Sequence, residues 1–307
     1  MLKRIAGIIL LLFIMTACNA NNTKENDELL IYTSIYPLEY IVEELAGDQV
    51  VAESIYPPGV DAHTYEPTSR EITQLADGDA FIYMGAGMEG FAETMADALK
   101  NQDISFIEIG QQETLFQENK HDDHDHDDEH EHHGDLDPHI WLDPVRMIQV
   151  AELITNELIE LQPNQKDIFL ENLSIFTEKM TVLDEKFAAT LTDNPNHHIL
   201  VSHAAYGYWE QRYGIEQISI SGLSSSDEPS QKELASIAKL AKEKDIKYVI
   251  FEQTGSNRIA TIIQDHIKAE ALYIHNLEVL TEEDIENNED YYSLMEKNLH
   301  VLDKATK

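Results

Sequence analysis

Residues 66–85 read EPTSREITQLADGDAFIYMG, and residues 228–252 read EPSQKELASIAKLAKEKDIKYVIFE. Both stretches begin with Glu-Pro followed by Thr or Ser, and both carry a second Glu five residues after the first. In each stretch a helix pattern comes next, and an apolar strand pattern follows the helix. The same order of features at two places in one chain indicates an internal duplication, so the sequence predicts two similar lobes.

Strand and helix patterns alternate in both halves of the chain. This alternation favours α/β units, in which helices cover a mostly parallel sheet. Ligands of such sheets bind beyond the carboxyl ends of the strands, so two lobes that face each other are expected to form a cleft between them. Strands are predicted at residues 29–36, 50–57, 80–85, 104–110, 197–206, 215–223, 246–253 and 271–278.

One long helix pattern separates the two halves. Residues 165–192 contain neither Gly nor Pro and carry apolar residues at helical spacing. A helix of this length spans roughly 40 Å, which is about the width of a domain. We interpret it as a rigid connection between the lobes; the alternative is an ordinary core helix within one domain. The predicted divisions are an N-terminal lobe at 29–163, the connecting helix at 164–193 and a C-terminal lobe at 194–307.

The first residues have the features of an export signal. Two basic residues precede an apolar run that ends at Met15 and is too short to span a bilayer as a stable helix. Small residues then precede Cys18, an arrangement that resembles the bacterial lipobox, although Met15 stands where that pattern prefers Leu. We predict a signal peptide at 1–17, a lipidated Cys18 with a flexible tether at 18–28, and an extracytoplasmic protein anchored to the cell membrane. An ordinary cleaved signal with an incidental Cys is the alternative.

The composition limits the kinds of partner. The 307-residue chain carries a formal net charge of −37. A charge of this sign repels nucleic acids and anionic lipid surfaces and attracts cations, which argues against a nucleic-acid-binding function. Cys18 is the only cysteine, so neither an internal disulfide nor a thiolate metal site can form. Any metal site must therefore use nitrogen and oxygen ligands.

Residues 121–133 consist only of His, Asp and Glu. Six imidazoles and seven carboxylates cannot bury an apolar core, so we predict a hydrated loop at residues 120–134. Our hypothesis is that the loop collects zinc weakly, since imidazole is a good ligand for late first-row metals. An acidic solubilising loop is the alternative. The imidazoles belong to His121, His124, His126, His130, His132 and His133.

Four predicted loops each offer one good metal ligand. They contain His63 in DAHTYEPT, His139 in DPHIWLDP, His203 in ILVSHAAYGY and Glu278 in YIHNLEVL. A lone His is more often a packed or surface residue, but two of these ligands fall in each half of the duplicated chain. Three imidazoles and one carboxylate form a tetrahedral set that suits zinc. Glu252 and His275 are rival candidates for the fourth ligand.

The candidate ligands also need supporting groups. A ligating histidine usually donates its other ring N–H to a carboxylate or a carbonyl, which fixes the orientation of the ring. The carboxylates that we predict for this role are Glu66, Asp143 and Glu252. Which carboxylate supports which histidine is left open.

Several segments together resemble the metal-binding lipoproteins of bacterial zinc and manganese ABC importers. They are DAHTYEPTSREI from Asp61, DPHIWLDP from Asp137, VSHAAYGYW from Val201, SSSDEPSQKEL from Ser224 and NLEVLTEED from Asn276. The resemblance covers nearly the whole mature chain. It implies two lobes joined by one long helix, with a metal ion between them. It also implies delivery of the metal to the permease and ATPase subunits of an importer, without enzymatic activity. The ligand positions that it implies are His63, His139, His203 and Glu278.

The resemblance also bears on the choice of metal. Manganese-type members carry an acid where His203 stands, whereas zinc-type members have a third His there, as in this chain. We therefore expect a monomeric protein with one tight site for Zn²⁺. Manganese or another divalent metal of the same importer class is the alternative. Two other classes remain as rivals: a surface adhesin that carries zinc, and a secreted zinc hydrolase, which needs an open coordination position and for which the chain has no HExxH run.

Overall fold

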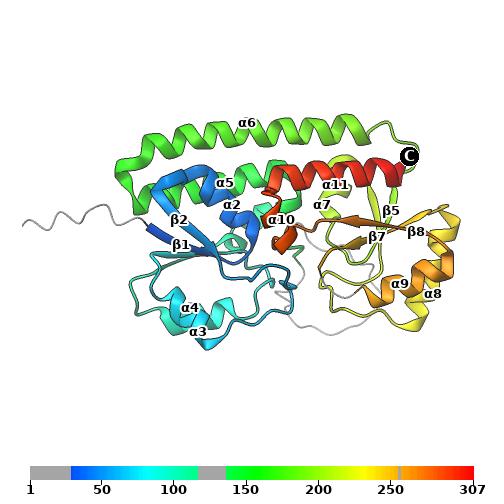
Figure 1. The fold of residues 1–307 in the computed structure, drawn as a ribbon, viewed down its shortest axis with the longest axis horizontal. Helices are drawn as coiled ribbons and strands as arrows, with labels where there is room; N and C mark the ends of the chain where they lie inside the picture. The colour runs from blue at the N-terminus through cyan, green and yellow to red at the C-terminus, as the bar shows by residue number, and fades with distance from the viewer. Residues whose placement is uncertain (1–28, 117–135, 255–256) are drawn as a thin grey trace, which may run out of the picture.

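Figure 1 shows two α/β lobes side by side, with helix α6 (Lys166–Leu191) running along the same edge of both. In this computed structural model the described residues are 29–116, 136–254 and 257–307. The predicted signal peptide, the Cys18 tether and the His-rich loop at 120–134 lie outside them. No helix within the described ranges combines the length and the apolar composition needed to cross a bilayer.

The N-terminal lobe is built on a four-stranded sheet in which every neighbouring pair of strands is parallel. Its strands are β1 (Leu29–Thr33), β2 (Val50–Ser54), β3 (Ala80–Tyr83) and β4 (Ser105–Glu108). Its helices are α2 (Tyr36–Ala46), α3 (Ser69–Leu75) and α4 (Ala92–Leu99). The strands lie in the order β2-β1-β3-β4.

The C-terminal lobe repeats this topology. Its strands are β5 (His198–Val201), β6 (Glu216–Ser219), β7 (Tyr248–Glu252) and β8 (Glu270–Ile274). They are all parallel and lie in the order β6-β5-β7-β8, so the first strand has the second and third as neighbours in both lobes. The prediction of two similar α/β lobes is therefore confirmed. The helices are α7 (Gly207–Tyr213), α8 (Gln231–Glu243), α9 (Arg258–Ile267), α10 (Glu282–Glu286) and α11 (Tyr291–Thr306).

The repeated Glu-Pro motif marks the start of equivalent helices. Thr68 caps α3 by accepting a hydrogen bond from the Glu71 N–H, while the Glu71 carboxylate accepts one from the Thr68 N–H at 2.6 Å. Ser230 and Glu233 make the same reciprocal pair at the start of α8, where the second bond is 2.7 Å long. These capping boxes satisfy two backbone N–H groups that would otherwise lack partners. The duplication thus preserves a helix start signal.

Helix α6 is the long helix that the sequence predicted. It packs against α2 and α5 (Pro144–Leu161) on one side of the molecule and against α7 and α11 on the other. Ile168 belongs to the same apolar pattern but is 43% exposed, because its neighbour Phe169 already faces the core and adjacent helical residues point about 100° apart. The side chains that α6 buries are Phe169, Phe176, Met180, Leu183, Phe187 and Leu191.

The largest hydrophobic core is shared between the lobes. It extends from the N-terminal sheet through α5 and α6 to Leu277, Val279 and Tyr291, which follow the last strand of the C-terminal lobe. A second, smaller core lies under α8 and α9 and includes Leu200 and Phe251. The segment after β8 is therefore packed into the junction between the lobes, and this packing positions the site described next.

Candidate metal centre

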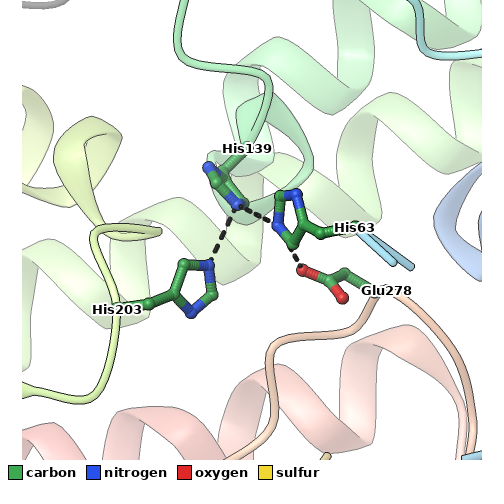
Figure 2. Close-up of side chains that lie close together, drawn as sticks. All are labelled: His63, His139, His203 and Glu278. Carbon is green, nitrogen blue, oxygen red and sulfur yellow. Dashed lines mark hydrogen bonds and ion pairs between the residues drawn. The ribbon is translucent and has the colours of Figure 1, made fainter. Parts of the chain in front are cut away.

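The four candidate ligands come together at the junction of the lobes, as Figure 2 shows. His63 lies on the loop after β2, and His139 lies just before α5. His203 follows β5 by two residues, and Glu278 follows β8 by four. His139, His203 and Glu278 are buried, and one ligand atom from each of the four residues lies within 4.8 Å of every other.

Three of the six distances between these atoms match a tetrahedron around one ion. His139 Nε2 lies 3.3 Å from His63 Nε2 and 3.2 Å from His203 Nε2. His63 Nε2 lies 3.3 Å from Oε1 of Glu278. A tetrahedral zinc ion with bonds of about 2.0–2.1 Å separates its ligand atoms by about 3.3–3.4 Å. Since all four atoms also lie within 4.8 Å of one another, these side chains can surround one small divalent ion.

The opposite ring nitrogens of two histidines contact buried carboxylates. His139 Nδ1 lies 2.7 Å from Asp137 Oδ1, and His203 Nδ1 lies 2.7 Å from Glu252 Oε1. A proton on each Nδ1 leaves a bare lone pair on each Nε2. Lone pairs that face each other at 3.2 Å repel unless an electrophile lies between them, so this tautomer suits metal ligation.

The predicted supporting carboxylates have different surroundings. Glu252 contacts His203 as described. Asp143 instead caps α5 and accepts hydrogen bonds from Arg146 and Arg212, the latter at 2.6 and 2.8 Å. Among the described residues we find no hydrogen bond from Glu66 or Asp143 to a histidine of the cluster.

The rival fourth ligands do not join the cluster. The carboxylate of Glu252 contacts the far side of the His203 ring. His275 directs its Nε2 toward Asp284 at 3.0 Å, and its Nδ1 accepts a hydrogen bond from the Leu277 N–H at 2.9 Å. Neither residue therefore belongs to the group of converging ligand atoms.

Asp137 is a functional candidate that the sequence reasoning missed. Its Oδ1 accepts a hydrogen bond from the His139 N–H at 3.0 Å as well as contacting the ring. This local pattern, an Asp that bonds the backbone two residues later, is common in turns. The sequence signal that could have identified Asp137 is an Asp two residues before a candidate His ligand.

Glu278 is positioned by contacts that cross between the lobes. The N–H of Tyr36 in the N-terminal lobe donates to the Glu278 carbonyl at 2.9 Å. Asn276 Oδ1 accepts from the Glu278 N–H, and the Trp141 ring N–H donates to the Asn276 carbonyl at 2.8 Å. Leu277 has φ of 68°, a conformation unfavourable for Leu, which the surrounding core imposes.

The loop of His63 also contacts the opposite lobe. Asp61 Oδ1 accepts a hydrogen bond from the His63 N–H at 3.0 Å. The other oxygen, Oδ2, accepts one from the Ser225 hydroxyl at 2.6 Å. One carboxylate thus links the ligand loop of the N-terminal lobe to a loop of the C-terminal lobe.

The electrostatics of the cluster affect proton competition. Burial lowers the pKa of His203, but the Glu252 carboxylate outweighs this effect and raises that pKa to about 9. Burial raises the pKa of Glu278, yet the contact with His63 and the other two imidazoles lowers it to about 2. The pKa of His139 is lowered, because burial outweighs the effect of Asp137. A metal ion that binds here must therefore displace a proton from His203 at neutral pH.

The fold and the cluster define a class of protein: a two-lobed α/β binding protein with a candidate site for a divalent metal between its lobes. Residues 31–305 match the family described as "Zinc-uptake complex component A periplasmic", and the chain belongs to this family.

Individual relatives are similar over most of this chain. The zinc-binding lipoprotein AdcA of Streptococcus pneumoniae is 33% identical over 99% of this chain, which spans only 61% of the length of that relative. The high-affinity zinc uptake system protein ZnuA of Bacillus subtilis is 28% identical, with 98% of each chain covered. The crystal structure of the Zn(II)-bound ZnuA-like domain of S. pneumoniae AdcA superimposes with a TM-score of 0.73 at 32% identity, covering 91% of this chain and 99% of that domain.

Proposed function

We propose that this protein binds Zn²⁺ outside the cytoplasm and delivers it to the permease and ATPase subunits of an ABC importer. The observation that carries the proposal is the convergence of ligand atoms from three imidazoles and one carboxylate to within 4.8 Å of one another, with three of the separations at 3.2–3.3 Å. Membership of the zinc-uptake family and the zinc-bound structure of a similar domain support the same metal.

The ligand set favours zinc over manganese. Mn²⁺ prefers sites rich in carboxylate oxygens and a higher coordination number, whereas three imidazoles favour zinc and the neighbouring late metals. His203 is the residue that matters most in this comparison, because an acid in its place would make the set half carboxylate. The Glu252 contact further suits an imidazole, since a second carboxylate beside Glu252 would be repelled.

We infer that the protein acts by binding and not by catalysis. A catalytic zinc site keeps one position open for water and usually has three protein ligands. Four protein ligands at tetrahedral spacing would leave no such position. The negative net charge of −37 would also attract cations to the site.

Attachment and assembly are part of the same proposal. Lipidation of Cys18 would hold the protein beside the importer at the membrane, and the residues after it would act as a tether. A monomer would present both lobes to the permease.

Metal analysis and competition titration of the purified protein test the proposal. We expect one Zn²⁺ per chain, bound far more tightly than Mn²⁺, and loss of this tight site in His139→Ala. Glu178→Gln is the control, because Glu178 lies exposed on α6. Manganese binding at equal or higher affinity would contradict zinc selectivity. If added zinc failed to restore the growth of a strain that lacks the protein, the import function would be contradicted.

A further inference from the structure

The two candidate ligands of the C-terminal lobe follow strands that are not neighbours in the sheet. His203 follows β5 and Glu278 follows β8, and β7 lies between these two strands. The carboxyl end of β7 is therefore the place from which one side chain can reach toward both ligands. Glu252, the last residue of β7, is 4% exposed there.

The carboxylate of Glu252 has a different partner at each oxygen. Oε1 lies 2.7 Å from His203 Nδ1 and accepts a hydrogen bond from the Tyr206 hydroxyl at 2.9 Å. Oε2 accepts a hydrogen bond from Asn276 Nδ2 at 3.3 Å. One oxygen thus contacts the ligand after β5, while the other contacts the segment after β8.

The side-chain amide of Asn276 continues this connection to Glu278. Its Oδ1 accepts a hydrogen bond from the Glu278 N–H at 3.2 Å, and its Nδ2 lies 3.4 Å from Thr254 Oγ1 as well as contacting Glu252. Rotating the amide by half a turn would place Oδ1 against the Glu252 carboxylate, so the surroundings define its orientation. Asn276 is 2% exposed and joins the carboxylate behind one ligand to the backbone of another.

The backbone of Asn276 extends the same connection toward a third ligand. Its carbonyl accepts a hydrogen bond from the Trp141 ring N–H at 2.8 Å, and the centre of the Trp141 ring lies 5.1 Å from that of His139. The preceding residue is held separately, because the N–H and the carbonyl of His275 bond the Asn298 amide at 2.8 and 2.7 Å. Removing only the Asn276 side chain should therefore leave the anchoring of this backbone in place.

The Asn276 side chain also spans the unfavourable conformation at Leu277. The hydrogen bond from the Glu278 N–H back to Asn276 Oδ1 closes a turn around Leu277, whose φ is 68°. Without the amide, both the Glu278 N–H and Glu252 Oε2 would lose this partner, and burial of an unpaired polar group is unfavourable. Movement of either group would displace a ligand atom of the metal centre.

We propose that Asn276 is a positioning residue of the metal centre, which holds Glu278 and the Glu252–His203 pair at the separation that zinc requires. The proposal rests on the zinc-binding function proposed above. Ligands that are fixed before the metal arrives bind it more tightly than ligands that must be ordered by it. The Asn276 amide supplies this order between ligands that follow two different strands.

Competition titration of the purified full-length protein with zinc and a chromophoric chelator tests the proposal. Asn276→Ala should weaken zinc binding at least tenfold, mainly through faster dissociation. Asn194→Ala is the matched control, because Asn194 is also buried and donates to Thr306 at 2.7 Å beside the end of α11. It should lower the melting temperature of the metal-free protein and leave the zinc affinity unchanged. Equal weakening in both variants, or unchanged zinc affinity in a folded Asn276→Ala protein, would overturn the proposal.

An exchange of donor and acceptor tests the contact itself. In the parent protein, Asn276→Asp places a second carboxylate opposite Glu252 Oε2 and should weaken zinc binding. In a Glu252→Gln background the new amide nitrogen faces position 276, so Asn276→Asp supplies its acceptor and should strengthen zinc binding. An added negative charge acting only on the metal would strengthen binding in both backgrounds. The same direction of change in both backgrounds would therefore overturn the proposal.

The same titrations separate this inference from the proposed function. If the zinc-binding function is wrong, the parent protein itself will lack a tight zinc site. If only the role of Asn276 is wrong, the parent and Asn276→Ala will bind zinc equally tightly.

Discussion

Replacing Glu252 by Gln should change the pH dependence of zinc binding more than its strength at neutral pH. Glu252 Oε1 lies 2.7 Å from His203 Nδ1 and accepts a hydrogen bond from the Tyr206 hydroxyl at 2.9 Å. Gln has the same shape but no charge. Its amide nitrogen would face the side-chain nitrogen of Asn276, which lies 3.3 Å from the other Glu252 oxygen. The substitution thus removes the charge and disturbs one further contact.

Two effects of opposite sign follow. Loss of a carboxylate that supports a metal-ligating His typically weakens metal binding by about 10–100-fold, which corresponds to about 1.4–2.7 kcal/mol. The same loss removes the main cause of the raised pKa of His203, which is about 9 with Glu252 present. At pH 7, two units below this pKa, His203 is almost fully protonated, and displacing its proton costs about 100-fold in apparent zinc affinity. Glu252→Gln should remove most of this cost.

The steepness of the pH dependence therefore differs between the proteins. In the parent protein, His203 becomes neutral only as the pH rises toward 9, so apparent zinc affinity should rise about tenfold per pH unit between pH 6.5 and 8.5. In Glu252→Gln the pKa of His203 should fall, because burial lowers it and only the charges of Glu278 and Asp61 still raise it. Its affinity should change little over the same interval.

Competition with a chromophoric chelator between pH 6.5 and 8.5 measures both curves. We expect the variant to be weaker than the parent at pH 8.5 and equal or tighter at pH 6.5, where the proton on His203 costs the parent about 300-fold. Calorimetry in buffers of different ionisation enthalpy should detect about one proton released per zinc by the parent at pH 7 and fewer by the variant. Glu178→Gln controls for the change in net charge. Parallel pH curves would refute the assignment of the competing proton to the His203–Glu252 pair.

Three further predictions concern closure, stability and the loop. Asp61→Ala removes both the contact with the His63 backbone and the contact with Ser225, so zinc should dissociate roughly tenfold faster when measured by stopped-flow chelation. Ser225→Ala should give a smaller increase in the dissociation rate. Unchanged rates would show that this link between the lobes does not retain the metal. Phe176→Ala should lower the free energy of unfolding by about 3–5 kcal/mol in denaturant titrations, since its ring is 1% exposed between the helices, and a loss below about 1 kcal/mol would contradict the packing of α6. Deletion of residues 120–134 should leave one tight zinc per chain and slow growth only when zinc is scarce; loss of the tight site would refute the collector hypothesis.

The elements were largely predictable because their signals are local. The capping boxes at Thr68 and Ser230 announce α3 and α8, and apolar periodicity defines α6. The short helix α10 (Glu282–Glu286) was not predicted, since its five residues include four acids and no buried side chain. The loop histidines were identified as candidates because imidazoles after strands are chemically distinctive.

The supporting contacts of the site were harder to predict. Of the predicted supporting carboxylates, Glu252 contacts His203, whereas Asp143 contacts arginines instead. Asp61 and Ser225 are 164 residues apart, and no pattern in the chain relates them. The positive φ of Leu277 has no sequence signal, because Leu does not favour that conformation.

The sequence by itself determined the periodicity of each element, the duplication of the lobes and the residue types able to bind a metal. Only the tertiary structure decided that His63, His139, His203 and Glu278 share a centre and that Glu278 is held from the opposite lobe by Tyr36. The physical reason is the separation along the chain over which each effect acts. Propensity and capping act over a few residues, whereas the convergence of four ligand atoms to within 4.8 Å of one another depends on how α6 and the shared core pack two separate sheets against each other.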